Sequence, residues 1–141
     1  MRLLRPLVYL WAFPTTLLGL LFIPAAVISG GGIQIVDGVI EVYGGFVSFF
    51  LRYCTLLRGG ASAMTLGHVV LGRDRFLLEA TRSHERIHVR QVERWGPLFI
   101  PAYAVAALAM LLMGRSPYHD NPFEREAYGW SLHSSDRRAS L

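Results

Sequence analysis

The sequence predicts a single α+β domain, residues 1–141, that is mainly helical, carries a small β-sheet and associates with a membrane through an N-terminal helix. Hydrophobic residues make up 52% of the chain and its mean hydropathy is +0.36, both high for a soluble protein of this length. Two long stretches, 6–36 and 97–114, carry no charged side chain. Between them lie short β-branched runs separated by glycines, which are typical of strands and turns.

The charge of the chain narrows the class of partner. The formal net charge is +4, every basic residue is arginine, and the isoelectric point is near 9.7. Such a balance suits an anionic membrane surface as well as nucleic acid, and the long apolar stretches favour membrane lipid over nucleic acid. Cys54 is the only cysteine, so an internal disulfide and a cysteine-based zinc site are both excluded. Any metal would have to bind histidines and carboxylates.

The first element is an apolar segment, residues 6–29, that we interpret as a retained membrane anchor helix. It is long enough to cross about 30 Å of hydrocarbon. Arg2 and Arg5 precede it and favour a cytoplasmic N-terminus. No clear small-x-small cleavage site follows before Gly30, which argues against a signal peptide. We expect a kink at Pro14.

The region 30–141 begins with strand signals. Residues 33–43 form two β-branched runs around Asp37-Gly38, a dipeptide that tolerates the positive φ angles of a type I′ hairpin turn. Residues 46–57 place aromatic side chains at helical spacing and predict an amphipathic helix, although a strand is the alternative. Residues 63–71 predict one strand, which in a zinc protease could pair with an extended substrate. His68 within it is more often simply hydrogen-bonded than a metal ligand.

The next helix carries the chemistry. Asp74 can cap a helix over residues 75–95, and this helix contains His84-Glu85-x-x-His88. Positions four apart lie on one helix face, so the two imidazoles can converge on a single ion, and Glu85 then lies beside the ion as a general base. The arginines at positions 82, 86, 90 and 94 lie across from the histidines, and we interpret them as a solvated helix face, with contact to lipid phosphates as the weaker alternative.

The second apolar stretch constrains the topology. Gly96-Pro97 ends the histidine helix, and residues 98–113 could enter a membrane. A simple crossing would leave the downstream ligand candidate on the other side of the bilayer from the histidines, because no unpaired strand can return through lipid. We therefore expect a helical hairpin, with 98–113 folded back beside the histidine helix and packed on the N-terminal segment.

Candidate third ligands lie near the C-terminus. Asn121-Pro122 begins another helix, and Glu124 and Glu126 follow within its first turns. Because Glu124 falls three residues after Asn121, its carboxylate could instead complete a capping box on the backbone amide of Asn121. Helix geometry alone does not decide between the two glutamates. The tail from Ser131 onward is polar and basic.

The two motifs together resemble a known family. His84-Glu85-x-x-His88 followed by Glu124-x-x-Ala127 is similar to the gluzincin metalloproteases, particularly the membrane CAAX-protease and heat-shock-protease family, whose second motif is Glu-x-x-Ala-Asp. The resemblance implies a zincin-like fold for residues 30–141. It also implies zinc bound by His84, His88 and Glu124, with Glu85 as the catalytic base.

The alignment within this family favours Glu124 over Glu126, because Ala127 then matches the family's alanine. Tyr128 stands where the family has aspartate, so a carboxylate that orients a ligand is missing. Residues 63–130 also resemble a group of small uncharacterised bacterial proteins, which implies a location in the bacterial inner membrane.

The sequence thus predicts a membrane-associated zinc metallopeptidase acting on a peptide or protein substrate, with Glu85 as general base. The alternative is a non-catalytic membrane-bound binding or scaffold protein, with a structural metal or none. A peptidase also needs a donor for the oxyanion, and the sequence does not rank the four candidates near the second motif. These are Tyr118, His119, Tyr128 and His133.

Overall fold

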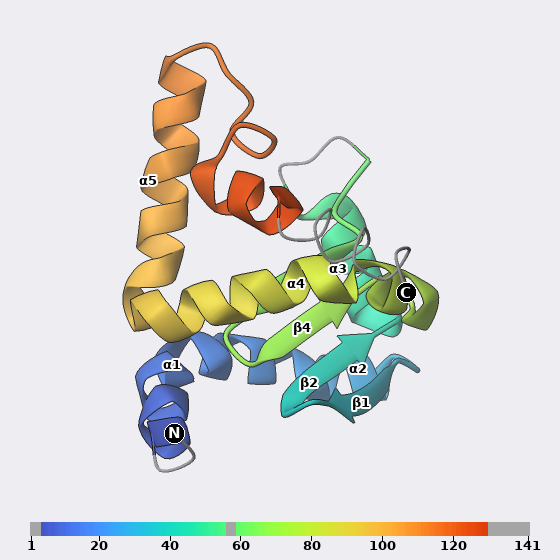
Figure 1. Ribbon diagram of the computed structural model, residues 1–141. Coiled ribbons are helices and arrows are strands. Elements are labelled where there is room, and N and C mark those ends of the chain that lie inside the picture. The colour runs from blue at the N-terminus through green and yellow to red at the C-terminus, as the bar shows by residue number, and fades with distance from the viewer. Residues whose placement is uncertain (1–3, 56–58, 130–141) are drawn as a thin grey trace, which may run out of the picture.

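The computed structural model describes residues 4–55 and 59–129 and has the predicted α+β class. A four-stranded sheet lies between helices (Figure 1). The long helix α4, Arg75–Trp95, covers one face of the sheet. Helices α1, Arg5–Leu20, α2, Phe22–Ile28, and α3, Gly45–Tyr53, cover the other face. The sheet is therefore the middle of three layers.

The sheet has the strand order β1-β2-β4-β3. β1, Gly32–Val36, and β2, Val39–Tyr43, form the predicted hairpin. Its turn residues Asp37 and Gly38 have φ angles of 51° and 78°, as a type I′ turn requires. β2 pairs in parallel with β4, Val69–Gly72. Alternate residues of β4 point to opposite layers, with Val69 and Leu71 among the α2 and α3 side chains and Val70 against α4.

The prediction of one strand over residues 63–71 is wrong. The segment is a second hairpin, in which β3, Ala63–Leu66, pairs antiparallel with β4. Gly67 has a φ of 66° at the first position of the two-residue turn, where a type II′ turn favours glycine. The Gly-His dipeptide was therefore a turn signal inside an apolar run. As a result β3 is an edge strand of the sheet.

The N-terminal apolar segment is helical, but it is not a free-standing anchor. The helix continues through Pro14 and breaks at Leu21 instead. Pro24 lacks the N–H that would bond to the carbonyl of Leu20, which accounts for the break. One side of α1 is buried on the β3–β4 hairpin and on the end of α4, where Gly19 lies directly against Val69. The opposite side exposes leucines.

Helix α4 has the predicted bounds and caps. Asp74 accepts a hydrogen bond from the backbone amide of Leu77 at 2.8 Å, and Gly96 ends the helix with a φ of 59°. A short 3-10 turn, η2, Gly96–Leu98, then leads into α5, Phe99–Leu112. By length and composition, the helical stretches Arg5–Ile28 and Arg75–Leu112 could each cross a membrane.

The predicted helical hairpin differs from the structure. α5 rises steeply from the end of α4 (Figure 1), and Phe99 and Tyr103 in its first two turns pack on its neighbours. There Phe99 joins Ala12 of α1 and Val92 of α4 in a small apolar cluster. The chain returns through residues 113–121, and residues 122–129 form a helix that lies over α4 (Figure 1). The return brings the second motif back to the histidines.

The arginine side of α4 is expected from the sequence to be solvated, but part of this side is packed on the sheet. Arg82 and Arg86 reach the sheet and pair with Glu41 of β2, whose side chain is 1% exposed. Only the later arginines, Arg90 and Arg94, are exposed. The interpretation missed the pair because a single glutamate in a β-branched run gave no sign that its carboxylate faces α4.

Glu41 accepts four hydrogen bonds, of which three come from α4 and one comes from β1 within the sheet. Its carboxylate accepts two from the guanidinium of Arg82, both at 2.9 Å, one from Arg86 at 3.1 Å and one from Gln34 at 2.7 Å. Burial alone would raise the pKa of Glu41, but these donors and the two positive charges lower it below its usual value of 4.5. The folded protein therefore stabilises the ionised form of the Glu41 carboxyl.

We expect Glu41→Gln to lower the free energy of unfolding by about 3 kcal/mol at neutral pH, because two part-buried guanidinium groups lose their counter-charge. Since the folded pKa is lowered, the stabilisation is present above pH 4.5 and is lost as the pH falls through the folded value. Denaturation followed by circular dichroism in mild detergent measures both effects. Glu79→Gln, which breaks an exposed ion pair with Arg75, is the control and should cost less than about 1 kcal/mol. Equal losses in the two variants would contradict the role of Glu41.

Candidate metal centre

Two histidines and one glutamate from distant parts of the chain meet at one point. Nε2 of His84 lies 3.0 Å from Oε2 of Glu124, and Nε2 of His88 lies 3.2 Å from the same oxygen. The two Nε2 atoms are 3.2 Å apart. Neighbouring ligands of a tetrahedral zinc, with bonds of about 2.0–2.1 Å, are separated by about 3.3 Å. All three side chains are buried, and the group could hold a metal ion.

The hydrogen bonds around His88 fix which of its nitrogens carries the proton. The side-chain amide of Gln91 donates to the carbonyl of Phe123 at 2.9 Å and to Glu126 at 3.2 Å, so its oxygen faces Nδ1 of His88 at 2.8 Å. Nδ1 must therefore donate. A neutral His88 then directs the lone pair of Nε2 at the carboxylate of Glu124, which is repulsive unless a cation lies between them.

The pKa values of His88 and Glu124 also indicate that a positive charge is favoured at this point. Burial alone would lower the pKa of His88, but the hydrogen bond and negative charge of Glu124 outweigh it and raise the pKa to about 9. Burial alone would raise the pKa of Glu124, but hydrogen bonds from His84 and His88 lower it to about 2. A proton on His88 thus balances the carboxylate in the metal-free protein. A metal ion would take its place, so the residues present fit a metal.

Tyr103 of α5 positions the carboxylate ligand. Its hydroxyl donates to Oε1 of Glu124 at 2.8 Å, which leaves Oε2 facing the histidines. The side chain of Asn121 also donates to the backbone carbonyl of Tyr103, at 3.3 Å. Sequence reasoning missed Tyr103. The signal was present, since it carries the only side-chain hydrogen-bonding group in the apolar segment 97–113.

Glu85 lies beside the group and not in it. Oε2 of Glu85 accepts a hydrogen bond from the hydroxyl of Thr65 in β3 at 2.6 Å, so a residue of the edge strand orients this carboxylate. Burial raises the pKa of Glu85, and the charges of His88 and His84 with the Thr65 bond offset this only in part. A carboxylate with a raised pKa next to a metal position suits a general base.

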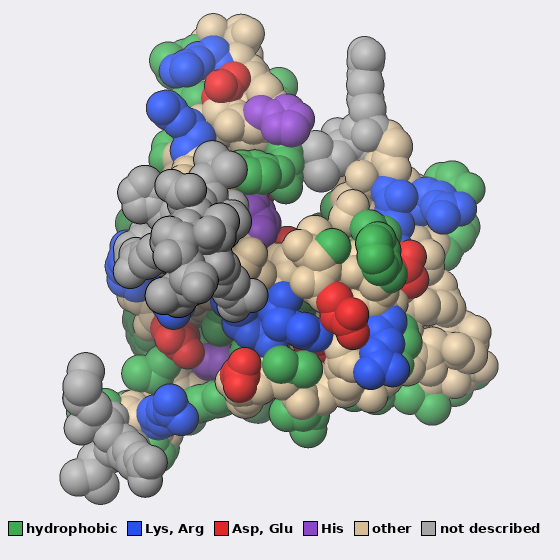
Figure 2. All heavy atoms as spheres, turned by 45° about the vertical axis from the view of Figure 1, so that its right-hand side comes forward, with side chains coloured by type: hydrophobic (Ala, Val, Ile, Leu, Met, Phe, Trp, Pro, Cys, Tyr) green, Lys and Arg blue, Asp and Glu red, His purple; other side chains and the backbone are tan. Residues whose placement is uncertain are grey.

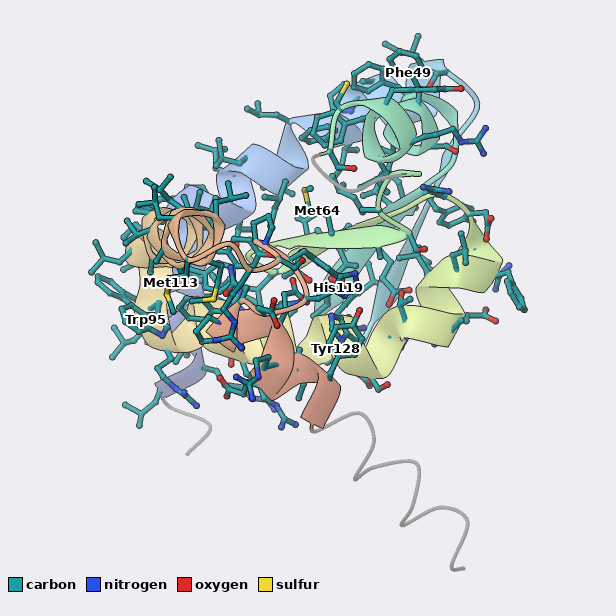
Figure 3. All side chains as sticks on the ribbon, turned by 90° about the horizontal axis from the view of Figure 1, so that it is seen from above. Phe49, Met64, Trp95, Met113, His119 and Tyr128 are labelled. Carbon is teal, nitrogen blue, oxygen red and sulfur yellow. The ribbon has the colours of Figure 1, made fainter. Side chains whose placement is uncertain are left out.

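A pocket of about 430 Å³ opens at His84 and Glu85. Its other walls are mostly small residues from the segment that leads into β3 and from the first half of α4, faced by Tyr118, His119 and Tyr128. Figure 2 shows the molecule hollowed on this side, with histidine side chains at the margin. In the view from above, His119 and Tyr128 lie close together over the sheet and α4 (Figure 3). The hydroxyls of Tyr118 and Tyr128 are 3.3 Å apart.

The departure from the family motif has a structural consequence at His84. The ring of Tyr128 packs against the imidazole of His84, with centroids 4.4 Å apart. Nδ1 of His84 is buried without a hydrogen-bond partner among residues 4–55 and 59–129. His84 is therefore held by ring packing, whereas His88 is held by the hydrogen bond from its Nδ1 to Gln91.

The structure also separates the alternatives that the sequence left open. The side chain of Asn121 caps the helix over residues 122–129 by accepting from the amide of Phe123 at 3.1 Å, while the carboxylate of Glu124 turns to the histidines. Glu126 contacts Gln91 and not the histidine pair.

His68 lies elsewhere in the fold. Its Nε2 is 2.9 Å from Glu93, and its ring stacks on Tyr9 at 4.0 Å, so it is hydrogen-bonded and takes no part in the metal group. The fourth oxyanion candidate, His133, lies outside the described residues.

Comparisons with models of known protein families, with curated proteins and with solved structures found no match to this chain. The fold and the site nevertheless define a class, namely an α+β domain with apolar helices and a buried His-His-Glu group that could hold a metal ion.

Proposed function

We propose that the chain is a membrane-associated, zinc-dependent metallopeptidase of the gluzincin type, in which His84, His88 and Glu124 hold the metal and Glu85 is the general base. The convergence of the three ligand atoms, each within 3.2 Å of the other two, carries the proposal. Two imidazoles and one carboxylate form a donor set that zinc takes in hydrolases. The ligands come from two separate helices, with His84 and His88 on α4 and Glu124 on the helix over residues 122–129.

The position of Glu85 supports hydrolysis. When bound, zinc would supply Lewis acidity that polarises a scissile carbonyl and acidifies a water molecule. Glu85 would take one proton from the attacking water as the water oxygen bonds to the carbonyl carbon. It would then pass this proton to the amine as the C–N bond breaks. Thr65 occupies one oxygen of Glu85, which leaves the other for water at the pocket that Glu85 lines.

The rival function is a non-catalytic scaffold in which a metal ties α4 to the helix over residues 122–129. Two observations favour it. The three ligands are 4–9% exposed, as in closed structural sites, and Tyr128 replaces the aspartate of the family motif beside His84. The pocket that reaches His84 and Glu85 favours the enzyme, because a structural site needs no access for substrate.

Metal content and turnover test the proposal together. We expect the purified full chain to contain one zinc ion and to cleave an unstructured protein such as casein. Removal of the metal with a chelator should abolish cleavage, and equimolar zinc should restore it, because the ligand atoms remain in place. If the protein binds zinc but cleaves nothing in a broad peptide library, the peptidase proposal is rejected and the scaffold function remains.

A further inference from the structure

Helix α5 presents an apolar surface that has no partner among the described residues. Apart from Tyr103 its side chains are hydrocarbon or thioether, and no charge occurs from Pro97 to Gly114. A helix that covers a protein core shows one apolar stripe, whereas a helix that is apolar all round is either buried or in lipid. α5 is not buried. Its large exposed side chains after Tyr103 are Val105, Leu108, Leu111 and Leu112.

The length of α5 and the course of the chain determine how it could meet lipid. Its 14 residues extend about 21 Å, short of the roughly 30 Å of a hydrocarbon core. Its far end leads into Arg115 and Asp120, which would be costly to bury tip-first in a bilayer. The chain must also return to the histidines on the same side. α5 therefore fits along the surface of a bilayer, with its outer face in the acyl region.

A second apolar surface continues this face. Helix α1 exposes Leu7, Leu10 and Leu17 on the side away from the sheet. It meets the base of α5 at Gly96, which lies directly against the indole of Trp11. The start of α1 and the whole of α5 follow the same side of the molecule (Figure 1). Seen from above, Trp95 and Met113 also lie at this side (Figure 3).

Basic residues stand at the ends of these helices. Arg5 begins α1 and Arg115 follows α5, and the formal net charge of the chain is +4. Guanidinium groups at the edges of an apolar face suit the phosphates of anionic lipids. They do not suit a second copy of the same face, where like charges would meet. Lipid is therefore the occupant that the charges favour.

The inner face of α5 holds the carboxylate ligand of the candidate metal centre. Tyr103 donates to Glu124 at 2.8 Å and accepts at its backbone from Asn121 at 3.3 Å. The rings of Phe99 and Phe123 pack edge to face, with centroids 5.4 Å apart. Movement of α5 relative to α4 would therefore either move Glu124 relative to His84 and His88 or take the Tyr103 hydroxyl away from it.

We propose that a lipid bilayer binds the outer face of α5 and thereby fixes Tyr103, so that the affinity of the His-His-Glu group for metal depends on attachment to lipid. Tyr103 acts here as a positioning residue. The inference rests on the proposed metal centre and adds its regulation by the membrane. It does not require that the bound metal catalyses hydrolysis.

Zinc affinity with and without lipid tests the coupling. The full chain is titrated against a chromophoric zinc chelator, once in an amphipathic polymer and once bound to vesicles of phosphatidylcholine and phosphatidylglycerol. We expect about tenfold tighter zinc binding on vesicles, the effect typical of a group that orients a ligand. Tyr103→Phe should bind zinc about tenfold more weakly on vesicles and show no difference between the two conditions.

A surface variant tests the lipid contact separately. The triple variant V105S/L108S/L112S changes only exposed or outward residues of α5 and should lose both vesicle co-sedimentation and the gain in zinc affinity. The matched variant L7S/L10S/L17S changes exposed leucines of α1, and the protein that still binds vesicles should keep the gain in zinc affinity.

Three results would overturn the inference. The first is equal zinc affinity on vesicles and in polymer, and the second is full lipid dependence in Tyr103→Phe. The third is self-association through α5 without vesicle binding, which would make a second copy the partner. If zinc binding depends on lipid but no peptide is cleaved, the peptidase fails and the coupling stands. If peptide is cleaved with lipid-independent zinc affinity, only the coupling fails.

Discussion

Glu85→Gln should retain zinc and lose peptidase activity, with kcat/KM lower by about 10²–10⁴-fold. The amide has nearly the shape of the carboxylate and can still accept from Thr65, whose hydroxyl lies 2.6 Å from Oε2 in the native protein. It cannot accept the proton of the attacking water. Since Glu85 does not belong to the His-His-Glu group, the metal should stay bound. Zinc content by elemental analysis and cleavage of a fluorogenic peptide measure the two effects.

The control for this variant is Glu79→Gln on the same helix, where the carboxylate is exposed and pairs with Arg75 across one turn. Its activity should equal that of the native protein. Native activity in Glu85→Gln would remove the proposed mechanism. Loss of zinc from Glu85→Gln would instead show that this residue maintains the metal group, and its loss of activity would then say nothing about a base.

Most of the secondary structure could be predicted from local sequence patterns. Helix α4 begins after Asp74 and ends before Gly96 as predicted, because a side-chain cap and a positive φ act within one turn of the chain. The Asp37-Gly38 hairpin formed for the same reason. The Gly67 turn was missed because an unbroken apolar run outweighed a single glycine in the interpretation. Of the two turn residues, Gly67 has a positive φ of 66° and His68 does not.

The site was only half accessible to sequence reasoning. Four-residue spacing places His84 and His88 on one face of a helix, so their convergence follows from local geometry. The approach of Glu124 depends on how α5 and residues 113–121 return, and no local pattern encodes that path. The family resemblance selected Glu124, and the competing capping box was a real alternative from the residues alone. Gln91 and Tyr103 were missed because their roles exist only once both helices are in place.

Glu124→Gln should weaken zinc binding by more than about 100-fold, because it removes the only carboxylate among three ligands and puts a neutral amide in its place. The matched variant Glu126→Gln, two residues along the same helix, should keep zinc affinity within about threefold of the native value, since Glu126 contacts Gln91 and not the histidines. Competition with a chromophoric chelator measures both. The reverse ranking would make Glu126 the ligand and would contradict the structure of the site.

The contact of Glu124 with His88 can also be tested without any metal. In the metal-free native protein His88 should titrate near pH 9, because Glu124 raises the pKa against the opposing effect of burial. In Glu124→Gln that charge is gone, so burial should dominate and the midpoint should fall by several pH units. Imidazole NMR signals followed over pH 5–10 report the midpoint directly. An unchanged midpoint would mean that Glu124 does not face His88 in solution. This result would contradict both the proposed metal centre and the proposed peptidase activity.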